Sequence, residues 1–354
     1  MPAASDVPVV WSQTTLGHRP DREVWIGMPM EGSELPERVT VIEKALREAG
    51  HPFRDAQPHP VETLGSVHSD EFVRHLSTVY EAWVDGGFVS YGQDRVIPYF
   101  FPTDAMLGPI SPTPATSVHA AAGRFCYDTM TTVGPGSWAA IKAAADCALT
   151  AADLVRSGEA RRVYALCRPP GHHVTADAYG GSCYVNNAAL AAQALVQAGH
   201  QQVAVIDVDA HHGNGTAAIF YDRPDVTYGS VHVDPAAGWF PHVVGHAAET
   251  GRGAGTGTTL NIPLSPGSSD TEFLDGVRRL ASHAMTRGAT ALVVSLGVDA
   301  AVNDPESPLE VTEDGYGRAG AILLGELDLP TVVVQEGGYH LPTLGPLVAA
   351  FLSR

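Results

Sequence analysis

Carboxylate and imidazole side chains alternate in the segment Ile206–Gly215, which reads Ile-Asp-Val-Asp-Ala-His-His-Gly-Asn-Gly. Side chains of a strand alternate between its two faces, so Asp207, Asp209 and His211 would share one face if the strand continued that far. Two residue types at this spacing, followed by a glycine turn, suit a divalent metal ion. The alternative is an aspartate that caps a helix, followed by exposed histidines, and this segment alone leaves both interpretations open.

A third metal ligand would have to come from another strand end. Asp299 follows the apolar run Ala291–Leu296, and an acid in that position is costly to bury unless it is paired or bound to a metal. Asp209, His211 and Asp299 would form a site of two carboxylates and one imidazole. Such a site leaves coordination positions open for water and substrate, which indicates a catalytic metal.

Two more strand ends carry polar groups that hydrolysis could use. His172 and His173 follow the run Val163–Cys167, and Tyr339 ends a Glu-Gly-Gly-Tyr segment after Thr331–Gln335. Metal-assisted amide hydrolysis needs a base for water and an acid for the departing amine, and two histidines with different partners can divide these roles. The tyrosine can donate to a developing oxyanion. Taken separately, the histidine pair also fits a structural role and the tyrosine an ordinary turn; their coincidence favours one hydrolytic site.

The elements that position these residues alternate along the chain from about residue 138. Near-continuous apolar strands between helical patterns predict a parallel sheet covered on both faces, with ligands at the carboxyl ends of its strands. No linker composition divides the chain, so we expect one α/β domain whose N-terminal third is rich in loops, with a proline- and glycine-rich stretch at 86–118. The expected helices are 138–156, 187–198 and 271–287, and the expected strands are 163–167, 203–208, 226–231, 291–296 and 331–335.

The composition is that of a soluble globular enzyme, because 44% of the 354 residues are hydrophobic and 17% are charged. A formal net charge of −18 disfavours nucleic acid and acidic membranes and favours cationic ligands, although acidity can also serve solubility alone. Residues Met1–Trp11 lack the pattern of a signal peptide, and no apolar stretch is long enough to span a membrane. We therefore expect a cytoplasmic protein that binds neither nucleic acid nor membranes.

Five segments, in this order, resemble the histone deacetylase superfamily, most closely its bacterial acetylpolyamine amidohydrolases and class II deacetylases. The resemblance is strong from about residue 135 to 345 and weaker before that, where 35–39 and 67–70 are recognisable. It implies a single domain of the arginase–deacetylase α/β type and a metal-dependent deacetylase that hydrolyses a linear amide. The five segments are Arg168–His173, Gly180–Asn187, Asp207–Gly215, Leu296–Asp299 and Glu336–Tyr339.

The resemblance also implies metal ions and roles for the polar residues. Zinc, with iron(II) as the alternative in the cell, would be held by Asp209, His211 and Asp299. Structural potassium would lie nearby, partly on backbone carbonyls. The positions that match the potassium site are Asp207, Asp209, His211, Ser230 and Val231.

For catalysis, the resemblance implies that His173 acts as general base and acid and that His172 assists electrostatically. Asp207 would orient His172, and Asn214 would orient His173. Many family members carry an aspartate in place of Asn214, so His173 should be less basic here. Tyr339 would polarise the scissile carbonyl and then stabilise the oxyanion.

Four residues are implied for substrate binding. The carbonyl of Gly181 would accept the substrate amide N–H, and Phe240 would form one wall of a tunnel. Ser182 stands where many members have an aromatic residue, which opens one side of that tunnel unless Trp239 fills the gap. Glu306 occupies a rim position at which polyamine-deacetylating members have a glutamate, although a solvated loop glutamate is the plainer interpretation.

We therefore expect a deacetylase of a small acetylated amine such as an acetylated polyamine, with a protein or peptide acetyl-lysine deacetylase as the alternative. His119 and Met130 occupy the places where bacterial acetylpolyamine enzymes have acids, which weakens the polyamine expectation. The stretch 86–118 resembles the amidohydrolase loop that mediates dimerisation, so we expect a homodimer. A catalytically idle binding protein is a second alternative, but every position that the chemistry needs is filled. A binuclear manganese hydrolase is a third, but it needs more metal-facing carboxylates than the sequence offers.

Overall fold

The centre of the molecule is an eight-stranded sheet in which every pair of neighbouring strands is parallel. The computed structural model describes residues 7–353, and the strand order is β4-β1-β5-β10-β9-β6-β7-β8. This sheet confirms the predicted fold class. Its strands are β1 (Val9–Trp11), β4 (Phe53–Asp55), β5 (Arg162–Ala165), β6 (Val203–Asp207), β7 (Val226–Val233), β8 (Thr259–Leu264), β9 (Ala291–Leu296) and β10 (Thr331–Gln335).

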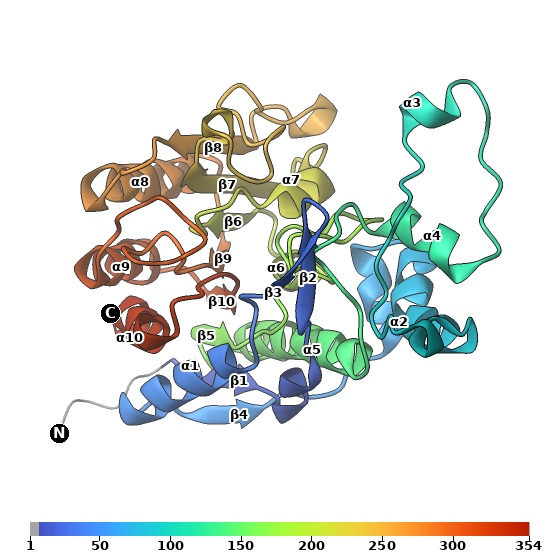
Figure 1. Ribbon diagram of the computed structural model, residues 1–354. Coiled ribbons are helices and arrows are strands. Elements are labelled where there is room, and N and C mark those ends of the chain that lie inside the picture. Colours follow the sequence, from blue (N-terminus) through green and yellow to red (C-terminus); the bar gives the residue numbers. More distant parts are fainter. Residues whose placement is uncertain (1–6, 354) are drawn as a thin grey trace.

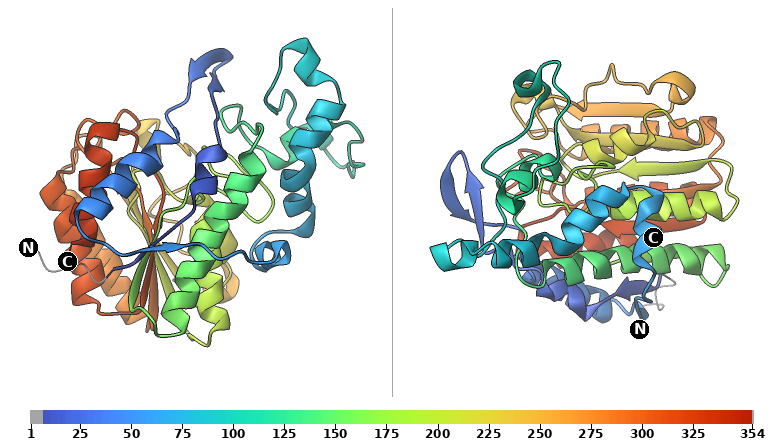
Figure 2. Two further views of the ribbon diagram at one scale, coloured as in Figure 1. Left: turned by 90° about the horizontal axis from the view of Figure 1, so that it is seen from below. Right: turned by 90° about the vertical axis from the view of Figure 1, so that its right-hand side faces the viewer.

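Helices cover both faces of the sheet, as Figure 2 shows edge-on. Each face has its own apolar cluster, because β6, β7, β9 and β10 are buried along their whole length and their side chains must pack on both sides. One face carries α1 (Glu37–Glu48), α8 (Asp270–Thr286), α9 (Glu313–Gly320) and α10 (Leu341–Leu352), and the other carries α5 (Ser137–Arg156), α6 (Asn187–Gln197) and α7 (Asn214–Phe220).

The strands β5, β10, β9 and β6 are consecutive neighbours in the middle of the sheet. Their register is regular: Val332 of β10 pairs with Val163 of β5 and Val293 of β9, and Val293 pairs with Val205 of β6. Because the strands are parallel, their carboxyl ends lie at one edge. The polar segments that follow these four strands therefore meet there.

The structure corrects several sequence predictions. Strand β6 ends at Asp207, so the condition for Asp209 and His211 to share a strand face with Asp207, that the strand continue to His211, is not met. Strand β8 was missed; it lies at the sheet edge and contains Pro263, which cannot donate to a ladder and obscures the strand pattern.

The N-terminal third is more regular than expected. It contains α1, α2 (Asp70–Asp85) and two three-residue strands, β1 and β4, which join the main sheet. Strands this short leave little periodicity in the sequence.

The remaining short helices are η1 (Gln13–Gly17), η2 (Val61–Ser66), η4 (Pro235–Ala237), η5 (Gly253–Gly255) and the π-helix η6 (Ala321–Glu326).

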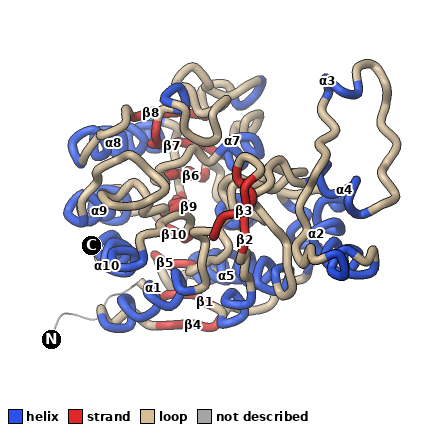
Figure 3. Tube along the Cα trace, in the orientation of Figure 1, coloured by secondary structure: helices blue, strands red, loops and turns tan. Residues whose placement is uncertain are grey.

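Two segments project from the main body. Residues 86–118 form a long excursion with η3 (Phe88–Tyr91) and α3 (Asp104–Leu107), and it returns through α4 (Val118–Phe125); most of it is loop in Figure 3. The second is an antiparallel hairpin of β2 (Arg22–Trp25) and β3 (Met28–Glu31). Both lie on the side of the molecule at which the central strands end (Figure 2, right).

Within residues 7–353, no helix is long and apolar enough to span a membrane. The signal-peptide expectation falls partly on Met1–Asp6, which lie outside the described residues. All four cysteines are free and buried.

Candidate active site

Three side chains that can bind a metal ion converge just beyond the ends of β6 and β9. The Nδ1 atom of His211 lies 3.2 Å from Oδ1 of Asp209 and 3.0 Å from Oδ2 of Asp299. Both aspartates are buried. The structure thus brings together the three residues that the sequence nominated as metal ligands.

Backbone amides fix the orientation of both carboxylates. Asp209 accepts hydrogen bonds from the amides of His211 (2.9 Å) and Gly337 (2.8 Å), and Asp299 accepts one from Ala210 (2.8 Å). A Cβ atom on Gly337 would lie 2.5 Å from a carboxylate oxygen of each aspartate, so only glycine allows this close approach. Such outer contacts preset ligand positions before an ion binds.

The charges of this group also fit a cation. Burial lowers the pKa of His211, but hydrogen bonds and attraction from Asp209 and Asp299 outweigh burial and raise it well above its usual range. Burial and the charge of Asp209 raise the pKa of Asp299 to about 7. Two buried carboxylates this close repel one another, and a positive charge between them relieves that repulsion.

The two adjacent histidines lie beside this group with different partners. Nδ1 of His172 lies 2.9 Å from Oδ2 of Asp207, and Nδ1 of His173 lies 2.7 Å from Oδ1 of Asn214. The ring centroids are 4.0 Å apart. His173 faces the cleft described below, whereas His172 is behind it.

These partners push the two imidazoles in opposite directions. Burial lowers the pKa of His172, but the carboxylates Asp209 and Asp207 outweigh it and raise the pKa to about 10. Burial lowers the pKa of His173 well below its usual range, and the charges of His172 and His211 lower it further. One histidine therefore keeps a proton while the other is neutral and able to accept one.

Tyr339 lines the same cleft as His173 and is held by Asp304 and Arg38. Its backbone amide donates to Oδ2 of Asp304 at 2.7 Å. The Arg38 guanidinium lies 4.8 Å from the centre of the Tyr339 ring and donates to the carbonyl of Gly338 at 2.7 Å. Neither supporting residue was predicted from the sequence; Arg38 lies inside the recognisable stretch 35–39, but nothing in that stretch indicates its contacts.

His211, one of the three candidate metal ligands, lines a cleft of about 640 Å³. Gly181, Ser182, Phe240 and Glu306, all predicted to bind substrate, line it together with Trp239. The Phe240 ring stands edge-on to His173, with centroids 4.8 Å apart. The full set of lining residues is Glu23, Trp25, Ser33, Tyr127, Asp128, Met130, His173, Gly181, Ser182, His211, Gly238, Trp239, Phe240, His242, Pro305, Glu306 and Tyr339.

Several cleft residues were not found from the sequence. Glu23 and Trp25 come from the β2–β3 hairpin, and Tyr127 and Asp128 follow α4. Met130, one of the two positions matched to acids of related enzymes, lines the cleft. The other, His119, instead stacks against the exposed Tyr99.

Asp128 holds the backbone of the cleft wall at Gly181. Its Oδ2 accepts a hydrogen bond of 2.6 Å from the amide of Gly181, and its Oδ1 accepts from Met130 and Thr131. The turn that it holds is unusual, because Gly181 and Ser182 both have φ of +59°, and a serine rarely adopts this conformation. The carboxylate of Asp128 is therefore occupied by the protein's own backbone.

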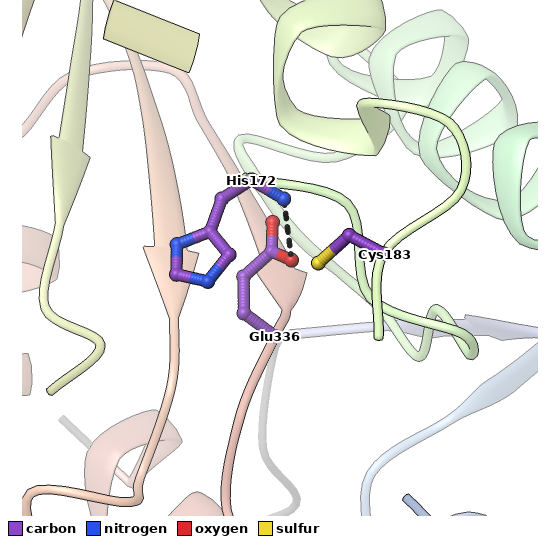
Figure 4. A group of neighbouring side chains, drawn as sticks. All are labelled: His172, Cys183 and Glu336. Carbon is purple, nitrogen blue, oxygen red and sulfur yellow. Dashed lines mark hydrogen bonds between the residues drawn. The ribbon is translucent and has the colours of Figure 1, made fainter. Parts of the chain in front are cut away.

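His172, Cys183 and Glu336 form a second compact group of potential ligands (Figure 4). Oε2 of Glu336 already accepts from the amides of Gly171 and His172, at 2.7 and 3.2 Å. Nδ1 of His172 is bonded to Asp207, and burial raises the pKa of the Cys183 thiol far above its usual range. A neutral thiol is a poor ligand, so this group supports the histidine pair and is a weaker metal site.

Some of the residues that match the family's potassium site lie on neighbouring strands. Asp207 on β6 pairs in register with Ser230 on β7, and Val231 follows on the same strand. The Ser230 hydroxyl lies 2.7 Å from Nδ1 of His232. A potassium site at these positions stays a prediction.

The fold and this arrangement define a class of protein, and comparisons agree with it. The histone deacetylase domain model matches residues 33–354. The chain therefore belongs to the histone deacetylase domain family and is a hydrolytic deacetylase.

The names of similar proteins are more specific than the family. An acetylpolyamine amidohydrolase of Burkholderia pseudomallei (strain 1710b) is 42% identical over 313 residues, which span 88% of this chain and 87% of the relative. An acetylpolyamine amidohydrolase of Mycoplana ramosa is 37% identical over 351 residues, 97% and 98% of the two chains. The crystal structure of an acetylpolyamine aminohydrolase from Burkholderia pseudomallei superposes with a TM-score of 0.91 at 39% identity and covers 98% of both chains.

Proposed function

We propose that this protein catalyses the zinc-dependent hydrolysis of the acetyl amide of a small cationic substrate, an acetylated polyamine, and releases acetate and the free amine. The observation that carries the proposal is the convergence of Asp209, His211 and Asp299, of which His211 lines the cleft together with His173 and Tyr339. Two carboxylates and one imidazole suit zinc and leave room for other ligands. Iron(II) accepts the same donors, and metal analysis of protein purified from its source distinguishes the two.

Zinc in this site would supply a Lewis acid that polarises the acetyl carbonyl and makes water more acidic. His173 would take the proton from water, because its Nδ1 donates to Oδ1 of Asn214 and leaves Nε2 free to accept. The same nitrogen would then protonate the leaving amine. His172, held by Asp207, would contribute a fixed positive charge.

The cleft walls would orient the amide. The Tyr339 hydroxyl would donate a hydrogen bond to the carbonyl oxygen, and this bond strengthens as negative charge develops there. The carbonyl of Gly181 would accept the amide N–H, and the Phe240 ring, which packs edge-on against His173 with centroids 4.8 Å apart, would form one wall for the methylene chain. Tyr339 is the hydrogen-bond donor that the protein would supply to the oxyanion, so removal of its phenol hydroxyl should reduce kcat.

A cationic substrate is supported by charge and by similarity. The chain has a formal net charge of −18, and the acids Glu23, Asp128 and Glu306 line the cleft. Relatives that match most of the chain are named acetylpolyamine amidohydrolases. An acetyl-lysine peptide is the alternative substrate, since acetyl-lysine carries the same amide on a similar methylene chain.

A substrate panel on zinc-loaded enzyme tests the proposal. We expect kcat/KM for N-acetylputrescine and N1-acetylspermidine to exceed that for an acetyl-lysine peptide, with Tyr339→Phe as the inactive control. Preference for the peptide would replace the polyamine with the protein substrate while leaving the deacetylase chemistry intact. Loss of activity on chelation and recovery with one zinc per chain are expected as well.

Homodimerisation through the 86–118 loop is a further part of the proposal. The loop exposes large apolar side chains that a second copy could cover, and exposed apolar patches commonly mark interfaces. Size-exclusion chromatography with light scattering should give twice the mass of one chain, and a monomer would contradict it. The side chains concerned are Tyr91, Tyr99, Met106 and Ile110, which are 86%, 73%, 59% and 71% exposed.

A further inference from the structure

Glu23 is a buried acid in the wall of the cleft. It lies on strand β2 of the projecting hairpin and is only 5% exposed, while the other three residues of that strand are half-buried or exposed. Its carboxyl oxygen packs against Gly32, where a Cβ atom would come within 2.6 Å. The side chain therefore has a defined place, and that place borders the cleft.

Nothing else in residues 7–353 compensates the carboxyl of Glu23. It makes no hydrogen bond or ion pair there, although a buried carboxylate without a partner is costly. Its electrostatic neighbours are the acids Glu306, Asp128 and Glu34, which together with burial raise the pKa of Glu23 to about 8. A neighbouring positive charge would remove this penalty, and the cleft is the open side from which it can arrive.

The acids of the cleft are not equally available to a ligand. The oxygens of Asp128 already accept hydrogen bonds from the backbone of Gly181, Met130 and Thr131. Glu306 is held only through its backbone, which accepts from Nε1 of Trp239 at 3.1 Å and donates to Asp304. The free carboxyl groups are thus those of Glu23 and Glu306, on segments far apart in sequence.

We propose that Glu23 is a specificity-determining residue that binds a protonated amine of the substrate inside the cleft, acting with Glu306. The inference rests on the proposed function and narrows its substrate class to amides that carry a positive charge beyond the acetylated nitrogen. An ammonium group donates up to three hydrogen bonds, so it can engage acids on two walls at once. Binding is accompanied by loss of the proton from Glu23, because the ammonium stabilises the ionised form.

The experiment compares two amides of nearly equal length, N-acetylputrescine and the uncharged N-pentylacetamide, on zinc-loaded enzyme. Glu23→Gln keeps the shape of the side chain and removes its charge. Glu31→Gln is the matched control, because it removes the same charge from an exposed position of the same hairpin. We expect Glu23→Gln to raise KM for N-acetylputrescine about tenfold and to leave kcat and the kinetics of N-pentylacetamide unchanged.

Each outcome has one meaning. If wild-type enzyme prefers N-acetylputrescine and Glu23→Gln keeps the full preference, the role of Glu23 is wrong and the proposed function stands. An equal loss on both amides would show that Glu23 is only structural, and circular dichroism would confirm a disturbed fold. A wild-type enzyme that hydrolyses both amides equally well would overturn the cationic substrate and this role of Glu23 together. Loss of preference in Glu31→Gln as well would assign the effect to overall charge.

Discussion

Two buried glutamates of the N-terminal third, Glu34 and Glu23, have opposite electrostatic surroundings. Oε1 of Glu34 accepts hydrogen bonds of 2.8 Å from both Arg38 and Arg168. Burial raises the pKa of Glu34, but these arginines outweigh it and lower the pKa. Glu23 has no such partner, and its pKa is raised to about 8. The compensated acid belongs to the scaffold behind the catalytic residues, and the uncompensated acid faces the cleft where substrate can supply the charge.

The difference separates two parts of the site. We call the candidate metal ligands with His173 and Tyr339 the floor, and the wall that carries Glu23 and Glu306 the mouth. Arg38 joins Glu34 to the floor, because it also contacts the Tyr339 ring and the carbonyl of Gly338. Changes behind the floor should therefore reduce stability or kcat. Changes at the mouth should alter KM and cost the fold little.

The largest effect on stability is expected from Glu34→Gln. The substitution leaves Arg38 and Arg168 buried without their shared carboxylate, and breaking a buried ion pair costs about 3–5 kcal/mol. Urea unfolding of wild type and Glu34→Gln, with the exposed Glu31→Gln as control, measures the loss. If the free energy of unfolding fell by less than about 1 kcal/mol, Glu34 would contribute little to the stability of the fold.

The largest effect on the reaction itself is expected from Tyr339→Phe. Loss of one donor to the oxyanion should lower kcat by about 10²–10³-fold while KM changes little. Steady-state kinetics on N-acetylputrescine measure both parameters. If Tyr339→Phe raised KM and kept kcat, Tyr339 would bind substrate as Glu23 does and would not stabilise the oxyanion.

A smaller effect is expected from Glu306→Gln. This side chain is more exposed than Glu23, so water and salt screen its interaction with an ammonium group, and KM for N-acetylputrescine should rise only about threefold. The increase should shrink further as sodium chloride is raised. An effect larger than that of Glu23→Gln would reverse the order of the two acids.

A separate effect, on the fold and not on the reaction, is a pH-dependent gain in stability for Glu23→Gln. An unfolded glutamate titrates near pH 4.3, and folded Glu23 titrates at about pH 8, so the folded state binds more protons between these values and wild-type stability falls as pH rises. The acids Asp128 and Glu306 and the imidazole of His242 line the same cleft, and Glu34 lies behind it. We expect the variant to gain about 1–3 kcal/mol relative to wild type between pH 5 and pH 8.5. Equal differences at both pH values would contradict a raised pKa of Glu23.

Much of the floor was predictable from the sequence because it depends on local order. Apolar strand runs mark where β5, β6, β9 and β10 end, and parallel strands bring those ends to one edge. The residues just after these ends, such as Asp209, His211 and Asp299, could therefore be grouped without coordinates. The match to the family confirmed the resemblance, and the parallel sheet confirmed the fold class.

The mouth was not predictable because it depends on contacts between distant segments. Glu23 lies in a short hairpin outside the main sheet, and its position over the cleft depends on how that hairpin folds back. Asp128 follows an eight-residue helix and reaches Gly181 across 53 positions of sequence. Neither residue belongs to a periodic pattern or a recognisable motif, and only the tertiary structure reveals their surroundings.

The proposed function requires Asp209, His211 and Asp299 to hold one catalytic metal ion. Anomalous diffraction at the zinc edge, on crystals of the zinc-loaded protein, tests it most directly. A single strong peak is expected within about 2.0–2.2 Å of a ligand atom from each of these three residues. A peak among His172, Cys183 and Glu336 instead, or no peak near Asp299, would contradict it.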